Sequence, residues 1–128
     1  MGWLADETGL EKCQANYTPL TPLSFLARAA DIFADREALV YGATRRSYAE
    51  YRDRVSRLAS GLAGLGVRPG DVVATILPNV PPHAEAHFGV PACGAVLNAI
   101  NTRLDVDTVR YILEHGGAKL VLVDSAFI

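Results

Sequence analysis

The chain has 128 residues, half of them hydrophobic, and its 12 Lys and Arg against 14 Asp and Glu give a formal net charge of −2. This length suits one domain with an ordinary core. Neither positive nor negative residues form a long run, which excludes charge-driven binding to nucleic acid or anionic membranes. Cys13 and Cys93 form no CxxC pair, which excludes a disulfide framework and a cysteine-rich zinc site.

A polar lead, residues 1–19, precedes the first predicted element. Thr21 and Pro22 supply an N-cap and a first-turn proline, and apolar residues recur at helical spacing as far as Phe33. A short amphipathic helix is therefore expected. In "EALVYGATRRSY", two short runs flank a turn-compatible centre at Gly42, which predicts a hairpin.

A capping box then predicts a long helix. The Ser47 hydroxyl can accept the N3 amide proton while the Glu50 carboxylate reaches back to the Ser47 amide. Apolar residues from Tyr51 to Leu65 share one side of this helix, and Gly66 ends it. This apolar stripe must pack against another element.

Strands and helices alternate in the second half of the chain. "DVVATILP" is continuously apolar, as expected of a strand covered on both faces, and a helix from about Pro81 to Cys93 follows. Within that helix Pro91 removes a hydrogen bond, which predicts a kink or a break. After the run "GAVLNAIN", Asp105 caps another helix, and "AKLVLVD" is the last apolar strand.

This order predicts an α/β fold, in which a βαβαβ parallel sheet layer carries flanking helices. Three parallel strands leave an exposed sheet edge, which other structure normally covers. The sequence is therefore expected to be the incomplete, leading part of a larger protein.

The stretch "HAEAH", residues 83–87, raises the possibility of a zinc site. His83 and His87 share a helix face at a separation that zinc enzymes use. In the zinc signature a Glu directly follows the first His, whereas Glu85 lies two residues on and points to the opposite side. A third ligand would have to be His115, Cys93 or a scattered carboxylate. A packed or partly exposed histidine pair is therefore favoured over a zinc hydrolase.

Other catalytic patterns are incomplete. Zinc deaminases carry Pro-Cys-x-x-Cys after His-x-Glu, but here Ala92 separates Pro91 from Cys93 and no second cysteine follows. "GLAGLG" lies inside and at the end of a helix, and there is no P-loop or serine elbow. The residues alone predict no catalytic, cofactor-binding or metal-binding side chain.

Four short motifs nevertheless occur in a characteristic order. Their residues are Ser47, Tyr48 and Glu50, then Gly70, Asp71 and Val73, then Pro78 and Asn79, and finally Cys93, Gly94, Ala95, Val96 and Asn101. From about Leu20 to the last residue, the chain resembles the start of the AMP-forming acyl-CoA synthetases, the acyl-adenylate-forming family that includes adenylation domains and luciferases. "NYTPLTPLSFL" looks closest to the branch that activates short, medium-chain or aromatic acids.

The resemblance implies a parent enzyme of fatty-acid or carboxylate metabolism that uses ATP, Mg²⁺ and coenzyme A. The Ser/Thr/Gly-rich loop with its Lys, the Tyr-Gly-x-Thr-Glu motif, the ribose-binding Asp and the C-terminal Lys do not occur before Ile128. Residues 20–128 are therefore expected to be the leading part of the N-terminal domain, truncated before the ATP-binding loop and inactive alone. The family pattern also puts His83 and His87 on the packing face of a helix, with Glu85 turned towards solvent or a polar neighbour.

The expected partners are the remainder of the synthetase chain and, for the parent, a carboxylic acid, with a homo-oligomer as a further possibility. No nucleic acid or membrane span is expected, since no apolar stretch approaches the needed length. The acidic N-terminus lacks signal-peptide features and the cysteines suit a reducing compartment, so a cytoplasmic location is predicted. The alternative is a standalone interaction module that uses the exposed sheet edge.

Overall fold

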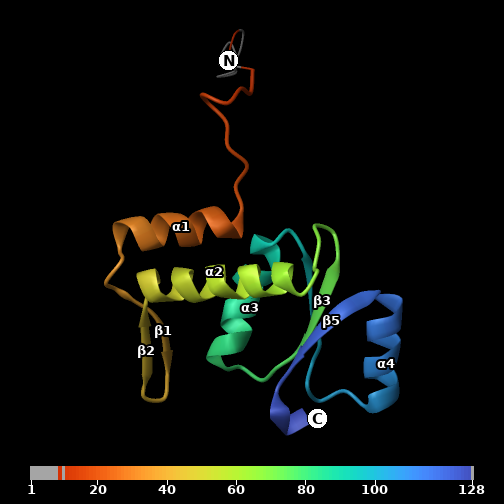
Figure 1. The fold of residues 1–128 in the computed structure, drawn as a ribbon. Helices are drawn as coiled ribbons and strands as arrows, with labels where there is room; N and C mark the ends of the chain where they lie inside the picture. Colours follow the sequence, from red (N-terminus) through yellow and green to blue (C-terminus); the bar gives the residue numbers. More distant parts are fainter. Residues whose placement is uncertain (1–8, 10, 128) are drawn as a thin grey trace, which may run out of the picture.

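In the computed structural model, which describes residues 9 and 11–127, the expected helices and strands form in the expected order (Figure 1). Their bounds are α1 (Pro22–Ile32), β1 (Glu37–Tyr41), β2 (Thr44–Ser47), α2 (Tyr48–Gly64), β3 (Val72–Ile76), α3 (Pro81–Ala92), β4 (Val96–Ala99), α4 (Val106–His115), β5 (Ala118–Val123) and the 3-10 turn η1 (Ser125–Phe127). Of the predicted polar lead, residues 1–8 and 10 lie outside the described residues. Residues 11–20 are exposed and extend away from the helices (Figure 1).

Local side-chain caps fix where three of the helices begin. The Thr21 hydroxyl accepts a hydrogen bond from the Ser24 amide at 3.3 Å. Ser47 accepts from the Glu50 amide at 3.3 Å, and the Glu50 carboxylate accepts from the Ser47 amide at 2.8 Å. Asp105 caps α4 at 3.0 Å. Each bond satisfies a first-turn amide that the helix itself leaves unpaired, so the predicted helix starts are confirmed.

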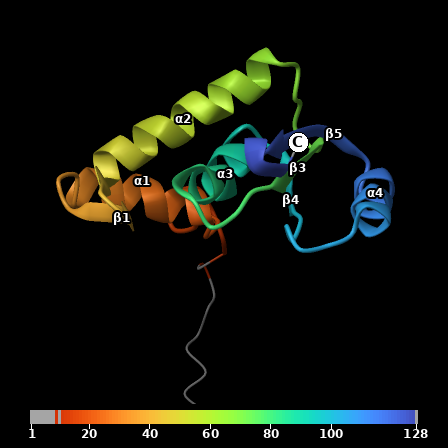
Figure 2. The same ribbon diagram turned by 90° about the horizontal axis from the view of Figure 1, so that it is seen from below.

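The three later strands form one parallel sheet in the order β4-β3-β5, with Val73 opposite Leu97 on one side and Leu120 on the other. β1 and β2 form a separate antiparallel hairpin. Seen from below, α1, α2 and α3 lie on one side of the sheet and α4 on the other (Figure 2). The predicted α/β fold with a βαβαβ parallel layer is confirmed.

The main hydrophobic core lies between the sheet and the pair α2 and α3. Its buried members are Leu62, Val67, Val73, Ala86, Val90 and Ala95. A second cluster joins α1 to α2 through Leu26, Tyr51 and Val55. Gly89 permits the close contact of α2 with α3, because a Cβ added there would lie 2.6 Å from Leu58 Cδ2.

Two expectations about helix ends need adjustment. Leu65 was expected on the packing stripe of α2, but it is 71% exposed, because the helix ends at Gly64 and Leu65 belongs to the turn that follows. The predicted break does not occur at Pro91, which lies inside α3, and the helix ends one residue later at Ala92. Pro91 removes the helical donor of the His87 carbonyl, but no further turn follows that the loss could disrupt.

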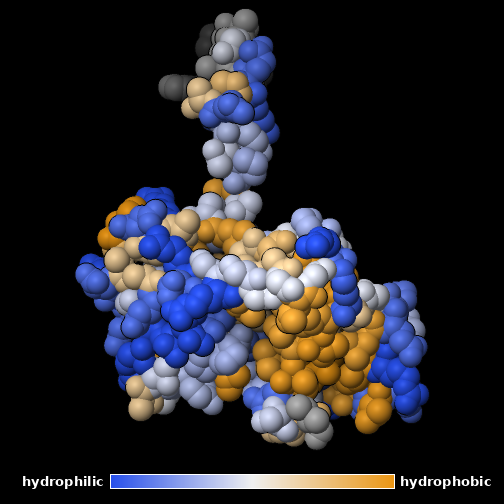
Figure 3. Space-filling view, viewed as in Figure 1, coloured by the Kyte–Doolittle hydropathy of each residue, from blue (hydrophilic) through white to orange (hydrophobic). Residues whose placement is uncertain are grey.

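The outer strands of the sheet have open edges. β5 alternates between half-buried and exposed residues, and Val121 and Val123 are 39% and 37% exposed. Figure 3 shows a broad hydrophobic area over β3 and β5. Within the described residues no further strand pairs with β4 or β5, so the expected exposed edge is confirmed. None of the helices described is long and apolar enough to cross a membrane.

Candidate functional site

A polar crevice opens at the carboxyl ends of β3 and β4. Its volume is about 500 Å³. The residues that follow the two strands line it, together with one histidine of α3, namely Leu77, Pro78, Asn79, His83, Ala99, Ile100, Asn101, Thr102 and Arg103. Amide, hydroxyl, imidazole and guanidinium groups thus meet in one hollow.

The topology of the sheet singles out this crevice. β3 and β4 are neighbours, and the helices that follow them, α3 and α4, lie on opposite sides of the sheet (Figure 2). In open α/β sheets, ligands bind outside the carboxyl ends of the strands, and the crevice lies at that edge of this sheet. The crevice is therefore the candidate functional site.

The loop after β4 is held in a fixed turn. The Ile100 amide donates to the Thr75 carbonyl at 2.9 Å, which extends the pairing of the strands. The Asn101 side-chain oxygen accepts from the Arg103 amide at 2.9 Å. No carboxylate among the described residues lies within ion-pair distance of the Arg103 guanidinium, so this exposed cation is available to an anion.

His83 is half-buried at the crevice. Its Nε2 has almost no solvent-exposed area and no partner with full hydrogen-bond geometry among the described residues, although the ring lies close enough to the Pro78 carbonyl to interact with it. Burial and the nearby His87 lower the pKa of His83, and the Pro78 carbonyl opposes this shift. Burial and the neighbouring histidine therefore favour the neutral form of His83.

His87 does not occupy the packing position that was expected for both histidines. It is exposed, its ring centroid lies 4.8 Å from that of His83, and its Nδ1 lies 2.8 Å from the His83 carbonyl. The buried residues of α3 are Glu85, Ala86, Gly89 and Val90, so the packing face is rotated away from His87. The expectation is wrong for His87 and holds only partly for the half-buried His83.

The two helices that begin at this edge do not offer a phosphate cradle. Pro81 and Pro82 carry no amide hydrogen, and the His83 amide already donates to the Val80 carbonyl at 2.9 Å. At α4 the Asp105 carboxylate occupies the position that a bound anion would take, and its bonds from Thr108 lower the pKa of this carboxyl group. Recognition in the crevice must therefore come from side chains.

Glu85 faces polar neighbours and not solvent, which is one of the two environments expected from the sequence. Its side chain is 7% exposed and accepts hydrogen bonds from Arg54 Nε at 2.5 Å and Nη2 at 3.1 Å, while Arg46 Nε lies 3.8 Å away. A carboxylate held this way joins α3 to α2 and to the hairpin and cannot act as a base beside the histidines. No cluster of three or more metal-ligating side chains occurs within the described part of the chain.

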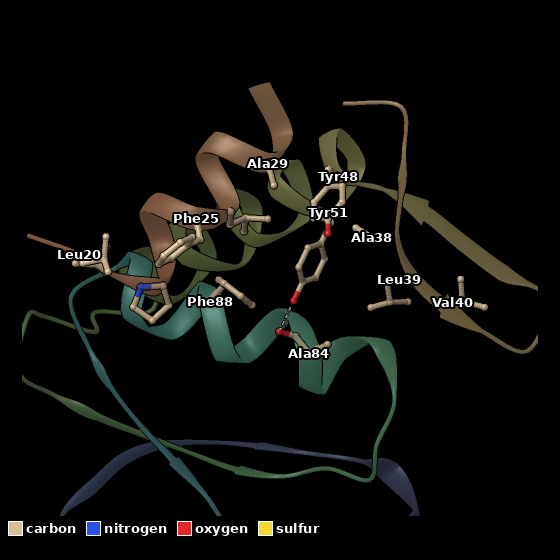
Figure 4. Close-up of a pocket in the computed structure, with 13 residues that line it drawn as sticks. Leu20, Phe25, Ala29, Ala38, Leu39, Val40, Tyr48, Tyr51, Ala84 and Phe88 are labelled. Carbon is tan, nitrogen blue, oxygen red and sulfur yellow. Dashed lines mark hydrogen bonds between the residues drawn. The ribbon is translucent and has the colours of Figure 1, made fainter. Parts of the chain in front are cut away.

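A larger, apolar groove of about 960 Å³ lies between α1, the hairpin, α2 and α3 (Figure 4). Phe25, Leu39 and Phe88 lie around it, and the Tyr51 hydroxyl donates to the Ala84 carbonyl at 2.7 Å. Burial, with a smaller contribution from the charge of Glu85, raises the pKa of Tyr51 to about 12. The described lining contains no charged side chain or histidine, so the groove offers shape without reactive groups.

Sequence reasoning assigned no role to the crevice residues. Asn79 and Asn101 enter the sequence analysis only as parts of family motifs, and His83 is considered there as a zinc ligand, disfavoured, and expected on the packing face of a helix. The available signal was positional, because all the polar residues except His83 directly follow the two predicted strands whose carboxyl ends meet.

Residues 26–127 match the family of AMP-binding enzymes. The chain is 47% identical over 122 residues to a peroxisomal acetate/butyrate–CoA ligase of Arabidopsis thaliana, covering 95% of this chain and 21% of that protein. It is 48% identical over 119 residues to a peroxisomal trans-cinnamate:CoA ligase of Petunia hybrida, covering 93% of this chain and 21% of the relative. The chain thus spans about a fifth of the length of these curated relatives.

A solved structure shares the arrangement of the described elements. The o-succinylbenzoate coenzyme A synthetase of Bacillus subtilis, in complex with ATP and magnesium ion, superposes with a TM-score of 0.78 at 30% identity. The similarity covers 81% of this chain and 28% of that one.

Proposed function

Because the chain belongs to the family of AMP-binding enzymes, we propose that it forms the leading scaffold of a carboxylate–CoA ligase. The observation that carries the proposal is the match over residues 26–127, together with 47% and 48% identity to two proteins named as CoA ligases. The acids in those names, acetate, butyrate and trans-cinnamate, support a short-chain or aromatic carboxylic acid as substrate.

The proposed reaction has two steps. A carboxylate oxygen attacks the α-phosphorus of ATP, which gives an acyl-adenylate and releases pyrophosphate, and the thiol of coenzyme A then attacks the acyl carbon and displaces AMP. Negative charge develops on phosphate and carbonyl oxygens in these steps, so fixed donors must surround them. This chain contributes the sheet and helices on which such a site is built, with the crevice of β3 and β4 facing the ligands.

The residues around the crevice do not fit Mg²⁺ or a cradled triphosphate. Mg²⁺ prefers carboxylate and water ligands, and no carboxylate lines the crevice among the described residues. The helix starts at Pro81 and Asp105 lack the free amides that a phosphate needs. We therefore derive no step through Mg²⁺ on this chain and assign to it no catalytic residue.

A graft tests the proposed function. Residues 20–128 would replace the matching part of the Petunia trans-cinnamate:CoA ligase, and thioester formation would be measured by chromatography with butyrate and with trans-cinnamate. The expected result is carboxylate-dependent thioester with at least one of the two acids. A graft that folds and binds ATP but makes no thioester with either acid would contradict the proposal.

A second function stays open because of the exposed sheet edge. An interaction module would pair β5 with a strand of a partner, and the exposed Val121 and Val123 would then become buried. Light scattering of the 128-residue chain separates the two functions. A folded monomer with no affinity for synthetase chains would exclude the module.

We also propose a reducing compartment for the protein. The support is that Cys13 and Cys93 are both free thiols. The cytoplasmic location stays a prediction, and the two relatives named above are described as peroxisomal. Fluorescence microscopy of a tagged chain checks it, with diffuse signal as the expected result and punctate signal as the contrary one.

A further inference from the structure

The outer edge of β5 has no partner strand among the described residues. Building on the second function above, the interaction module, we propose that this edge binds a second copy of the same chain. The two β5 strands pair antiparallel across a two-fold axis at Val121 and join the two sheets into one. The edge suits a second copy because its hydrogen-bonding groups, its leucines and its charge are all complementary to themselves in this register.

Alternate residues of β5 direct their backbone groups to the open edge. The Asp124 amide donates to the Ile76 carbonyl of β3 at 3.1 Å, and because the direction of the N–H groups alternates along a strand, the backbone of Leu122 also faces β3. The amide and carbonyl groups of Val121 and Val123 therefore point away from β3, where no strand of the described chain pairs with them. When Val121 lies opposite the same residue of the second copy, the two residues exchange two hydrogen bonds.

The side chains of β5 leave the main core open beside this edge. Leu120 and Leu122 pack against the core but are only half-buried, and the hydrophobic area of Figure 3 extends over this strand. With Val121 on the axis, Leu120 of each copy lies opposite Leu122 of the other, because residues opposite each other in an antiparallel pair share a face. A shift by two residues would set Leu122 opposite Ala118 or Leu120 opposite Asp124. Only the proposed register gives every leucine of both strands a leucine partner.

The charge on the edge does not oppose self-pairing. Lys119 is the one charged residue of β5, and lysine on an edge strand commonly prevents pairing. Here its Nζ donates to Asp71 Oδ2 at 2.7 Å and to the Gly66 carbonyl at 2.9 Å, so its charge is balanced within its own copy. In the proposed register Lys119 lies opposite Val123 and not opposite a second lysine, so no like charges meet.

Sedimentation velocity of the 128-residue chain over a range of concentrations tests the association. We expect an equilibrium of monomer and dimer without larger species, because each copy has one β5 and a two-fold contact closes on itself. Monomer at every concentration would overturn the inference.

Amide hydrogen exchange, measured by NMR on the same samples, locates the contact. The Val121 amide should exchange more slowly as the concentration rises. The Ala99 amide is the matched control, because the Ile100 amide donates to Thr75 of β3 and the Ala99 amide therefore faces the open edge of β4. Its exchange should not depend on concentration. A dimer in which the Val121 amide stays unprotected would overturn the inference.

Substitutions at Val121 make the register specific. Val121→Pro removes an amide that makes no bond in the monomer, and with it two hydrogen bonds of the dimer, one from each copy. The dissociation constant should therefore rise roughly thirtyfold. Val121→Lys and Val121→Glu each place like charges face to face at the axis, so both should be monomeric where the wild type is dimeric.

An equimolar mixture of the Lys and Glu variants should form a heterodimer, because opposite charges then meet at the axis. This mixture keeps the test decisive if Val121→Pro does not fold, and circular dichroism checks the fold of each variant. Val96→Lys is the matched control on β4, where the valine is 53% exposed, and it should leave the dimer unchanged. If both charged variants dimerise as tightly as wild type, or if their mixture does not associate, the pairing of Val121 with itself is wrong.

The inference and the proposed ligase function can fail separately. If the graft makes no thioester while the 128-residue chain dimerises through β5, the ligase function fails and the self-pairing stands. If the chain is a monomer, or if its dimer is insensitive to the charged variants of Val121, the inference is overturned even where the graft makes thioester.

Discussion

The close contact between α2 and α3 predicts that one alanine substitution will destabilise the protein while a chemically identical one stabilises it. Gly89 lies where α3 meets Leu58 of α2, and a Cβ at Gly89 would lie 2.6 Å from Leu58 Cδ2, 2.9 Å from Cγ and 3.1 Å from Cβ. Because three successive carbons are too close, rotation of the Leu58 side chain cannot relieve the contact. The two helices must therefore separate at this contact.

The change in the free energy of unfolding is the sum of two opposing contributions. Overpacking of a well-packed contact costs about 1–3 kcal/mol, and replacement of glycine by alanine in a helix interior returns about 1 kcal/mol. Gly89→Ala should therefore lower the free energy of unfolding by up to about 2 kcal/mol. Gly61→Ala in α2, where an added Cβ meets nothing within 4 Å, should raise it by about 1 kcal/mol.

Urea denaturation followed by circular dichroism measures both variants under one condition. A Leu58→Ala background adds a second check, because removal of the leucine side chain should abolish most of the cost of Gly89→Ala. If Gly89→Ala stabilised the protein as much as Gly61→Ala does, the described contact between α2 and α3 would be wrong.

Three further predictions concern charge and protonation. Glu85→Gln leaves the Arg54 guanidinium without its buried partner and should lower the free energy of unfolding by roughly 1–3 kcal/mol in urea titrations, a cost reduced because Arg54 is 37% exposed. Because burial raises the pKa of Tyr51 to about 12, the neutral tyrosine stabilises the fold below pH 10, and this stabilisation is lost as the pH rises towards 12. Ultraviolet titration should show one late-ionising tyrosine in the wild type that is missing from Tyr51→Phe. The hydrogen bond from Lys119 lowers the pKa of Asp71, so the ionised carboxylate stabilises the fold above pH 3.8 and this stabilisation is lost as the pH falls further. Lys119→Met should make the free energy of unfolding less dependent on pH in that range. An unchanged acid unfolding curve would contradict the pairing.

The sequence was most informative where structure depends on neighbouring residues. The Ser47 and Glu50 capping box and the Asp105 cap were predicted because each bond joins residues three apart, and the bond forms whenever the helix forms. The strand β3 was likewise predicted as covered on both faces, and its central residues, Val73 to Thr75, are buried.

Contacts between distant segments could not be predicted. Glu85 and Arg54 are 31 positions apart, and nothing local indicates that α3 crosses α2 at that point. The face of α3 was also misjudged, because apolar and small residues surround this helix and give no clear periodicity. His87 was therefore placed on the wrong face.

The candidate site shows the same limit. Arg103 and His83 line one crevice only because β3 and β4 pair in parallel and their following helices diverge. No role for the residues after these strands was predicted from the sequence, because which side chains meet there depends on the pairing of β3 with β4, a property of the folded chain.

We propose that these residues are the scaffold of a carboxylate-activating enzyme. This proposal is tested most directly by carboxylate-dependent exchange of labelled pyrophosphate into ATP, measured on the grafted ligase that carries residues 20–128. We expect exchange that requires butyrate or trans-cinnamate. Exchange that is absent from a folded graft, while the parent ligase exchanges normally in the same assay, would contradict it.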